Sequence, residues 1–503
     1  MGGIDIAVSW SKQSMAKHHS ATEKYDAVII GSGPNGLSAA VELTRSGLST
    51  LVVEAKASPG GGTRTEELTL PGFHHDVCSS VFPLGVASPF FRTLGLENFG
   101  LRWIESPAPL AHVIDDENAV TLERSLEATA NQLGSDGKAY KALLAPLVDR
   151  FDELMSMLLG PLRFPSSPLL FARFGLSGLT SIKGLVLQHF RTKAAAALLA
   201  GLAAHATLPL DAMATSAFAL VLAAAGHRVG WPIARGGSQA ITSALVAYLR
   251  SLGGDIVLDQ PIRSMADLPP ARAYIFDITP KQLLSIAGNA LPRLYRRRLG
   301  RFRYGAGVFK MDWALRDAIP WTSAACARAC TVHLAGDLEQ VARAEAIVHQ
   351  GGTAQVPFAL VVQPSRFDPT RAPEGKHTAW AYCHVPGGSS IDMARRIEDH
   401  IERYAPGFRA SIIGRSARDA QAMEAYNANY VGGDISGGAS DVRQLFFRPI
   451  MRLDPYTTPS ANIFICSSST PPGGGVHGMC GYWAARSVLN RLFGVRHAES
   501  APA

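Results

Sequence analysis

The sequence has 503 residues, more than one hydrophobic core ordinarily holds, so two domains are expected. Apolar residues make up 47% of it and charged residues 18%, which excludes a disordered chain and predicts a large buried interior. The net charge of +7 is small for this length, and no basic stripe interleaved with aromatic residues accompanies it, so nucleic acid is not an expected partner.

The first 24 residues contain neither the continuous apolar core of a secretory signal nor the arginine enrichment of an organelle transit peptide. We interpret them as a short extension in which Met15 is an alternative start. The resulting expectation is a soluble, cytoplasmic protein.

A nucleotide-binding pattern follows this extension. Tyr25–Ile30 is a short apolar run typical of a buried parallel strand. It leads into G-x-G-x-x-G at positions 31–36, and then into a helix that Gly47 is placed to end. Residues 50–54 supply a second strand. These elements, in this order within about thirty residues, predict a βαβ dinucleotide-binding unit.

Each glycine of this pattern has a physical task. Gly31 permits the tight turn, Gly33 admits a pyrophosphate, and Gly36 lets helix and strand pack closely. The free amides at the helix start, together with the helix dipole, hold negative phosphates. Glu54 is placed to accept hydrogen bonds from a ribose 2′-hydroxyl and would repel a 2′-phosphate, which disfavours NADP. The pattern by itself leaves FAD and NAD open.

Three further features favour FAD. Residues 55–65 combine three glycines with Arg64, which allows close backbone approach and places a cation near the phosphates. Three glycines at 473–475 precede a predicted helix at 482–492, and amides before that helix would face an anionic flavin ring. No second G-x-G-x-x-G introduces a separate nicotinamide domain in the middle of the chain. A flavoprotein that passes electrons to oxygen, a quinone or another acceptor fits this pattern.

Histidine and cysteine spacings predict no metal site and no redox dithiol. His74, His75 and Asp76 are adjacent, but neighbouring residues of a strand point to opposite faces. Cys326 and Cys330 are spaced like neighbours on one helix face, but no second ligand pair completes a zinc site. The sequence has no C-x-x-C pair.

Two segments bear on membrane contact. Residues 194–225 are the most apolar of the chain, but polar residues between positions 205 and 211 leave less than the roughly 20 residues of a membrane helix. Two buried alanine-rich helices, forming either a pocket wall or plain core, are predicted there instead. Six arginines between positions 293 and 303 predict a solvated helix face, with peripheral contact to anionic lipid headgroups as the alternative.

Ordered motifs extend from Tyr25 to Leu492. They are the glycine pattern at 31–36, EELTLPGF at 66–73, GWPIARGG at 230–237, PEGKHT at 373–378, NYVGGDIS at 429–436 and TPPGGGVHG at 470–478. Together they resemble the phytoene dehydrogenase-like flavoproteins, a group that includes bacterial carotenoid desaturases. Within it the chain is most similar to the branch typified by pyridine nucleotide-disulfide oxidoreductase domain-containing protein 2.

This resemblance implies an α/β fold with a glutathione-reductase-like, FAD-binding Rossmann domain and an interleaved α+β substrate domain. The FAD domain would combine residues 24–90, 229–290 and 442–495. Residues 91–228 and 291–441 would form the substrate domain over the reactive end of the cofactor.

The resemblance also implies which residues bind FAD. For the ADP half these are Gly31, Gly33, Pro34, Asn35, Gly36, Glu54 and Ala55, and for the pyrophosphate side Gly60, Gly61 and Arg64. Ile262 would end a β-segment and meet the adenine through its backbone, and Gly474, Gly475 and Val476 would lie along the flavin end.

Two departures from the family patterns argue against carotenoid or amine specificity. Pro471 and Pro472 follow Thr470 where carotenoid desaturases commonly have His-Pro. Gly62 stands where the amine-oxidase pattern has its arginine. Neither departure affects the prediction of FAD.

The leading hypothesis is FAD-linked dehydrogenation, that is desaturation, of a hydrophobic small molecule by hydride transfer to flavin N5. The alternatives are redox-neutral isomerisation on reduced flavin, and a flavin-binding regulatory or interaction protein with little turnover. The substrate, the electron acceptor and the oligomeric state stay open.

Few polar residues are candidates for the chemistry. His477 directly follows the glycine turn and is the candidate catalytic residue, as a hydrogen-bond donor to the flavin or a proton acceptor, with a helix cap as the structural alternative. Tyr482 would close the pocket or lie in the core. His377 and His384 lie in or next to a predicted strand at 378–385 that would face the substrate cavity.

Overall fold

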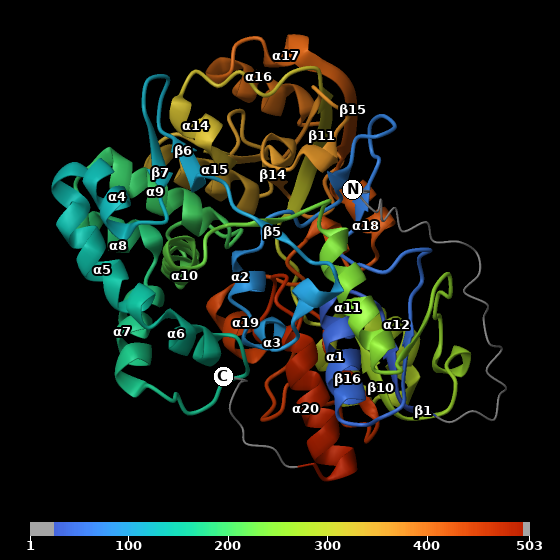
Figure 1. Cartoon of the computed structure of the whole chain (residues 1–503). Helices are drawn as coiled ribbons and strands as arrows, with labels where there is room; N and C mark the ends of the chain where they lie inside the picture. Colours follow the sequence, from blue (N-terminus) through green and yellow to red (C-terminus); the bar gives the residue numbers. More distant parts are fainter. Residues whose placement is uncertain (1–24, 496–503) are drawn as a thin grey trace.

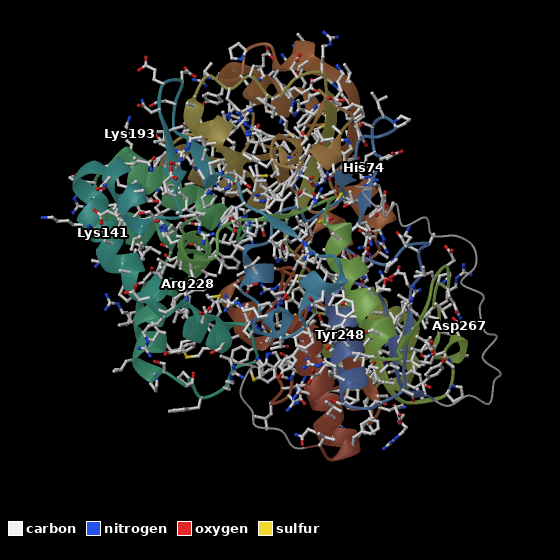
Figure 2. All side chains as sticks on the ribbon, viewed as in Figure 1. His74, Lys141, Lys193, Arg228, Tyr248 and Asp267 are labelled. Atoms are coloured by element: carbon white, nitrogen blue, oxygen red, sulfur yellow. The ribbon has the colours of Figure 1, made fainter. Side chains whose placement is uncertain are left out.

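The computed structural model describes residues 25–495, so the predicted N-terminal extension with Met15 lies outside the described residues. Within this range the chain forms a five-stranded sheet with its helices, a seven-stranded sheet, and a group of helices beside the second sheet (Figure 1). Lys141, Lys193 and Arg228 mark the helical side, and Tyr248 and Asp267 mark the side of the five-stranded sheet (Figure 2).

The five-stranded sheet is wholly parallel and has the order β16-β10-β1-β2-β9. Its strands are β1 (Tyr25–Ile30), β2 (Thr50–Val53), β9 (Asp255–Val257), β10 (Ala271–Phe276) and β16 (Ile463–Ile465). Strands far apart in the sequence therefore lie side by side, and their carboxyl ends meet at one edge, where ligands of open parallel sheets bind.

The predicted βαβ unit is confirmed. β1 is buried almost throughout, as expected for a strand covered on both faces. Helix α1 (Pro34–Arg45) starts with a proline, whose missing N–H is not needed there, and ends before Gly47, where φ is +85°. It packs between α11 (Gln239–Ser251) and α20 (Met479–Phe493).

The seven-stranded sheet has the order β15-β11-β14-β13-β12-β6-β7 and is antiparallel except between β12 and β6. Its strands are β6 (Ala108–Val113), β7 (Ala119–Leu122), β11 (Gly307–Leu315), β12 (Ala329–Leu334), β13 (Ala359–Val362), β14 (His377–Val385) and β15 (Ile412–Arg418). Two short ribbons pair β3 (Thr65–Glu66) with β4 (His75–Asp76) and β5 (Trp103–Ile104) with β8 (Ile233–Ala234).

The alanine-rich segment forms two buried helices, as predicted. They are α9 (Lys193–Ala204), which the Thr192 side chain caps, and α10 (Thr215–Arg228). The other longer helices are α4 (Leu126–Gln132), α5 (Gly137–Asp149), α6 (Phe151–Leu158), α7 (Pro168–Gly178), α8 (Ile182–His189), α12 (Pro280–Ala287), α13 (Arg293–Leu299), α15 (Leu338–His349), α16 (Ala394–Tyr404) and α18 (Ala420–Tyr426). The shorter ones are α2 (Pro83–Val86), α3 (Pro89–Arg92), α14 (Ala324–Arg328), α17 (Phe408–Ser411) and α19 (Val442–Phe447).

Among residues 25–495 no single helix is both long and apolar enough to cross a bilayer. α7 and α8 meet the length and composition criteria as a pair, but they are bent by 95° relative to each other.

Two sequence predictions are wrong. Cys326 lies in α14, but Cys330 lies in β12, so the two do not share a helix face. The β-segment assigned to end at Ile262 ends at Val257, and Ile262 lies in the loop that follows. Asp259, with φ +56°, interrupts the extended conformation between Val257 and Ile262.

Candidate functional site

The turn between β1 and α1 leaves no room for side chains. A Cβ on Gly36 would lie 2.2 Å from the carbonyl oxygen of Gly31, and one on Gly61 would lie 3.0 Å from the Cα of Gly33. The second glycine turn therefore packs directly on the first, and the Gly60 amide donates to the Ser32 carbonyl at 3.1 Å. The two turns together form a bare backbone surface at the start of α1.

Glu54 follows β2 and is fixed by four donors. The amide and hydroxyl of Ser32 donate to one carboxylate oxygen at 3.0 and 2.6 Å, and the Lys56 amide and Arg64 guanidinium donate to the other at 2.9 and 3.1 Å. The structure therefore brings Glu54 and Arg64 together as a buried ion pair beside the glycine turns. Arg64 also donates to the backbone oxygens of Ser58 and Gly61.

The start of α1 has free hydrogen-bonding capacity. Its cap residue, Gly33, contributes no side chain, so no cap side chain occupies the amides at the helix start. Backbone amides at such a helix start suit a phosphate. These features and the glycine turns fit the pyrophosphate of a dinucleotide.

Asp277 is a site residue that the sequence analysis missed. It follows β10, and the Gly36 amide donates to its Oδ2 at 2.8 Å. Burial, opposed by this hydrogen bond, raises the pKa of its carboxyl well above the usual 3.8. A neutral acid can remain next to a phosphate where a carboxylate would repel it. The sequence feature that could have identified Asp277 is an acidic residue directly after an apolar run, the same pattern as in residues 50–54.

Three of the predicted flavin-end residues line a cavity of about 500 Å³. They are Gly474, Gly475 and Val476, and the wholly buried His477 lines it as well. The Met479 amide donates to His477 Nδ1 at 3.0 Å, so in the neutral ring Nε2 carries the hydrogen. Burial lowers the pKa of this histidine to about 4, and its Nε2 has no hydrogen-bond partner among the described residues. His477 thus accepts a hydrogen bond at the start of α20 and is one of the residues that line the cavity.

One face of the seven-stranded sheet forms the roof of the cavity. Thr331, Leu360, Val362, Trp380 and Tyr382 line it. The register pairs them across three neighbouring strands, so all five side chains project from the same face, which we call the cavity face. The opposite wall comes from the helices, chiefly α6, α7 and α10.

Where the cavity face extends onto β11, it carries charged side chains. Lys310 and Asp312 form a buried ion pair opposite Tyr382 and Trp380 in the register, and the Lys310 ammonium lies 5.1 Å from the centre of a Trp380 ring. Close by, Asp76 of β4 pairs with the wholly buried Arg371 at 2.9 Å. The sequence analysis did not predict these pairs, because their members lie far apart in the chain or alternate along one strand.

The remaining predicted residues lie apart from the cavity. Tyr482 packs in the core with its ring 5.0 Å from that of Phe90. His384 is bonded to Glu345 at 2.9 Å, and His377 lies 3.2 Å from the Ser365 hydroxyl. Among residues 25–495, no group of three or more histidine, cysteine or acidic side chains is arranged to hold a metal ion.

The comparisons agree with this geometry. A family model described as "NAD(P)-binding Rossmann-like domain" matches residues 29–94. Pyridine nucleotide-disulfide oxidoreductase domain-containing protein 2 of Rattus norvegicus is 27% identical over 96% of this chain and 96% of its own. The lycopene-forming phytoene desaturase of Pseudescherichia vulneris is 24% identical over 90% of this chain and 96% of its own. The chain is an FAD-dependent oxidoreductase, and over most of its length it is similar to phytoene desaturase.

A solved structure shows the same fold for this flavoprotein. An oxidoreductase from Methanosarcina mazei superposes with a TM-score of 0.64 at 15% identity, over 93% of this chain and all of the other. FAD is the cofactor that the glycine turns, Glu54 and the cavity fit.

Proposed function

We propose that this flavoprotein dehydrogenates a largely apolar small molecule, on a fold of the glutathione-reductase type. A hydride would pass to flavin N5, and a proton from the neighbouring carbon would leave to solvent. The observation that carries the proposal is the cavity, which the predicted flavin-end residues and the cavity face of the sheet line together. An apolar substrate in that space would lie against the reactive end of the cofactor.

The protein's own groups bind, orient and exclude water. Gly474 and Gly475 let the backbone approach the flavin, which supplies the hydride acceptor when bound. His477 would offer its Nε2–H to the flavin and would not act as a proton acceptor, because its Nδ1 already accepts from the Met479 amide. Trp380 and Tyr382 form a flat, largely apolar roof that orients the substrate and keeps water out.

The test is anaerobic reduction of the FAD-loaded protein by a panel of isoprenoid lipids. We expect bleaching of the visible flavin band together with a product that has lost two hydrogens. Val221→Trp, which fills the cavity from α10, should abolish bleaching, whereas Val356→Trp at an exposed loop should not.

The same experiment separates the alternatives. A product with a moved double bond, formed only after prior flavin reduction, would replace the proposal with redox-neutral isomerisation. A protein that retains FAD but is bleached by no member of the panel would favour the regulatory or interaction role.

We further propose that the cavity opens toward a membrane surface. Leu162 lines the cavity and is also 57% exposed, so cavity and surface meet there. Phe164, Leu169 and Leu176, on or just before α7, are 80–88% exposed. An exposed apolar cluster at the opening of an apolar cavity is suited to contact with lipid. The exposed arginines on and after α13 form a separate candidate surface.

Vesicle co-sedimentation tests this contact. We expect binding to phosphatidylcholine vesicles that is lost in the variant Phe164→Ser, Leu169→Ser, Leu176→Ser. The variant Arg296→Gln, Arg297→Gln, Arg298→Gln should retain it. If anionic vesicles alone are bound, and the arginine variant loses that binding, α13 is the contact surface instead.

A further inference from the structure

Three histidines, of which His112 and His333 are buried and His205 is partly buried, extend from the cavity toward the seven-stranded sheet. His112 of β6 and His333 of β12 are neighbours in the parallel register, with ring centres 5.7 Å apart. His205, directly after α9, lies with its ring centre 5.1 Å from that of His333. Of the three, His205 lines the cavity.

Each of these rings is neutral. Burial lowers the pKa of His112 to about 4, that of His205 to about 3, and that of His333 well below the usual 6.5. A neutral imidazole has one N–H donor and one bare acceptor nitrogen, so fixing one role in a ring fixes the other.

The backbone fixes the first ring. His112 Nε2 lies 2.8 Å from the carbonyl oxygen of Gly336, so Nε2 carries the hydrogen and Nδ1 is bare. His112 Nδ1 and His333 Nδ1 both face Gly201 of α9, where a Cβ would lie 2.3 Å from the first and 2.7 Å from the second. Neither nitrogen has a hydrogen-bond partner among the described residues. Two lone pairs that converged on this point beside Gly201 would repel each other, which favours the hydrogen on His333 Nδ1.

The remaining roles follow from this assignment. With its hydrogen on Nδ1, His333 accepts at Nε2, so the His205 Nε2, 3.1 Å away, must donate. His205 Nδ1 is then a bare acceptor on the cavity wall and makes no hydrogen bond within residues 25–495. Thr331, two residues before His333 on the same strand face, lines the cavity with a buried hydroxyl that also has no partner.

We propose that this end of the cavity is a hydroxyl-binding site, in which a substrate O–H donates to His205 Nδ1 and its oxygen accepts from the Thr331 hydroxyl. The substrate is then an apolar alcohol, not a plain hydrocarbon. This inference rests on the proposed function for the identity of the ligand as the substrate, but the site itself is tested by binding alone.

Calorimetric titration of the FAD-loaded protein with three ligands of one carbon skeleton is the test. The ligands are geraniol, geranyl methyl ether and 2,6-dimethyl-2,6-octadiene. Geraniol can both donate and accept, the ether can accept from Thr331, and the hydrocarbon can do neither. We expect the alcohol to bind about tenfold more tightly than the hydrocarbon, with the ether between them.

Two variants separate the two contacts. His205→Phe should reduce the affinity for geraniol to that for the ether, and Thr331→Val should reduce the affinity for the ether to that for the hydrocarbon. His400→Phe and Thr378→Val are matched controls, since each removes a buried polar atom that has no partner and does not line the cavity. Neither should change the order of affinities.

Nitrogen-15 spectra of histidine-labelled protein provide a second measurement. His112 and His205 should show the Nε2–H tautomer, and His333 the Nδ1–H tautomer. Equal affinities for the three ligands, or an Nδ1–H tautomer at His205, would overturn the hydroxyl site and leave dehydrogenation standing. If the protein binds the alcohol more tightly than the ether and the hydrocarbon but none of them reduces the flavin, the hydroxyl site is supported and dehydrogenation is not. If none of the ligands binds, both proposals fail.

Discussion

The part of this flavoprotein around the five-stranded sheet, called here the nucleotide half after its proposed role, differs from the part around the seven-stranded sheet, called the substrate half. The two halves place their functional groups differently. Around the five-stranded sheet, the groups are backbone amides and glycine turns that lie within about thirty residues of one another, as in other dinucleotide-binding units. Around the seven-stranded sheet they are side chains that β-pairing brings together from distant segments, such as His112 and His333. The first site is specified by local sequence and the second by topology.

The largest expected loss of stability comes from a substitution where the two halves meet. Asp76, whose other partners include the Ser238 amide, pairs with Arg371 of the substrate half. Arg371→Met leaves a buried carboxylate without its counter-charge and should cost about 3–5 kcal/mol of unfolding free energy. The variant Arg371→Met, Asp76→Asn should recover much of that loss in chemical denaturation. Equal losses in the single and double variants would contradict the pairing.

The same pair predicts a pH dependence. Burial raises the pKa of Asp76, but Arg371 and the Ser238 amide more than offset this, so the pKa falls below its usual 3.8. A carboxyl whose pKa is lower in the folded state stabilises the protein above its unfolded pKa, and this stability is lost as the pH falls through the folded value. The difference in melting temperature between the wild type and the double variant should therefore shrink below about pH 4.

The next effect concerns the glycine turn. Gly36→Val places a Cβ against the Gly31 carbonyl and should cost about 3 kcal/mol and abolish FAD retention. Gly47→Ala is the control, because no atom lies within 4 Å of its Cβ position and its positive φ costs about 1 kcal/mol. Absorbance of the purified variants gives the FAD content. An FAD-replete Gly36→Val protein would show that this turn does not hold the cofactor.

The two halves also differ in how much of their structure could be predicted from the sequence. The βαβ unit and helix α20 could be predicted because spacing along the chain specifies them. Ile262 was misplaced because nothing in the sequence marks the positive φ of Asp259, which interrupts the extended conformation before Ile262. The grouping of His112, His205 and His333 could not be predicted, because it depends on the register between β6 and β12, which lie more than two hundred residues apart.

A smaller effect is expected at His477, which contributes a side chain to the flavin end. His477→Phe removes from this cavity-lining residue an N–H that has no partner among residues 25–495, and should slow flavin reduction about tenfold to a hundredfold. Because the pKa of His477 is about 4, the reduction rate should show no ionisation of this residue between pH 5 and 8. Stopped-flow reduction across that range is the measurement. A step near pH 6.5 that disappears in the variant would instead assign His477 as a base.

The smallest effect is expected at Glu54, where the role of a single side chain in the nucleotide half can be measured. Glu54→Gln keeps the shape but places an amide among the Ser32, Lys56 and Arg64 donors, so at least one of them loses its acceptor. FAD affinity should fall about tenfold, the magnitude of one charge-assisted hydrogen bond, in a fluorescence titration of the apoprotein. Glu127→Gln, which removes an exposed pair with Lys141, should leave the affinity unchanged. If Glu54→Gln were equally silent, the backbone alone would hold the nucleotide, and the contrast between the two halves would be sharper still.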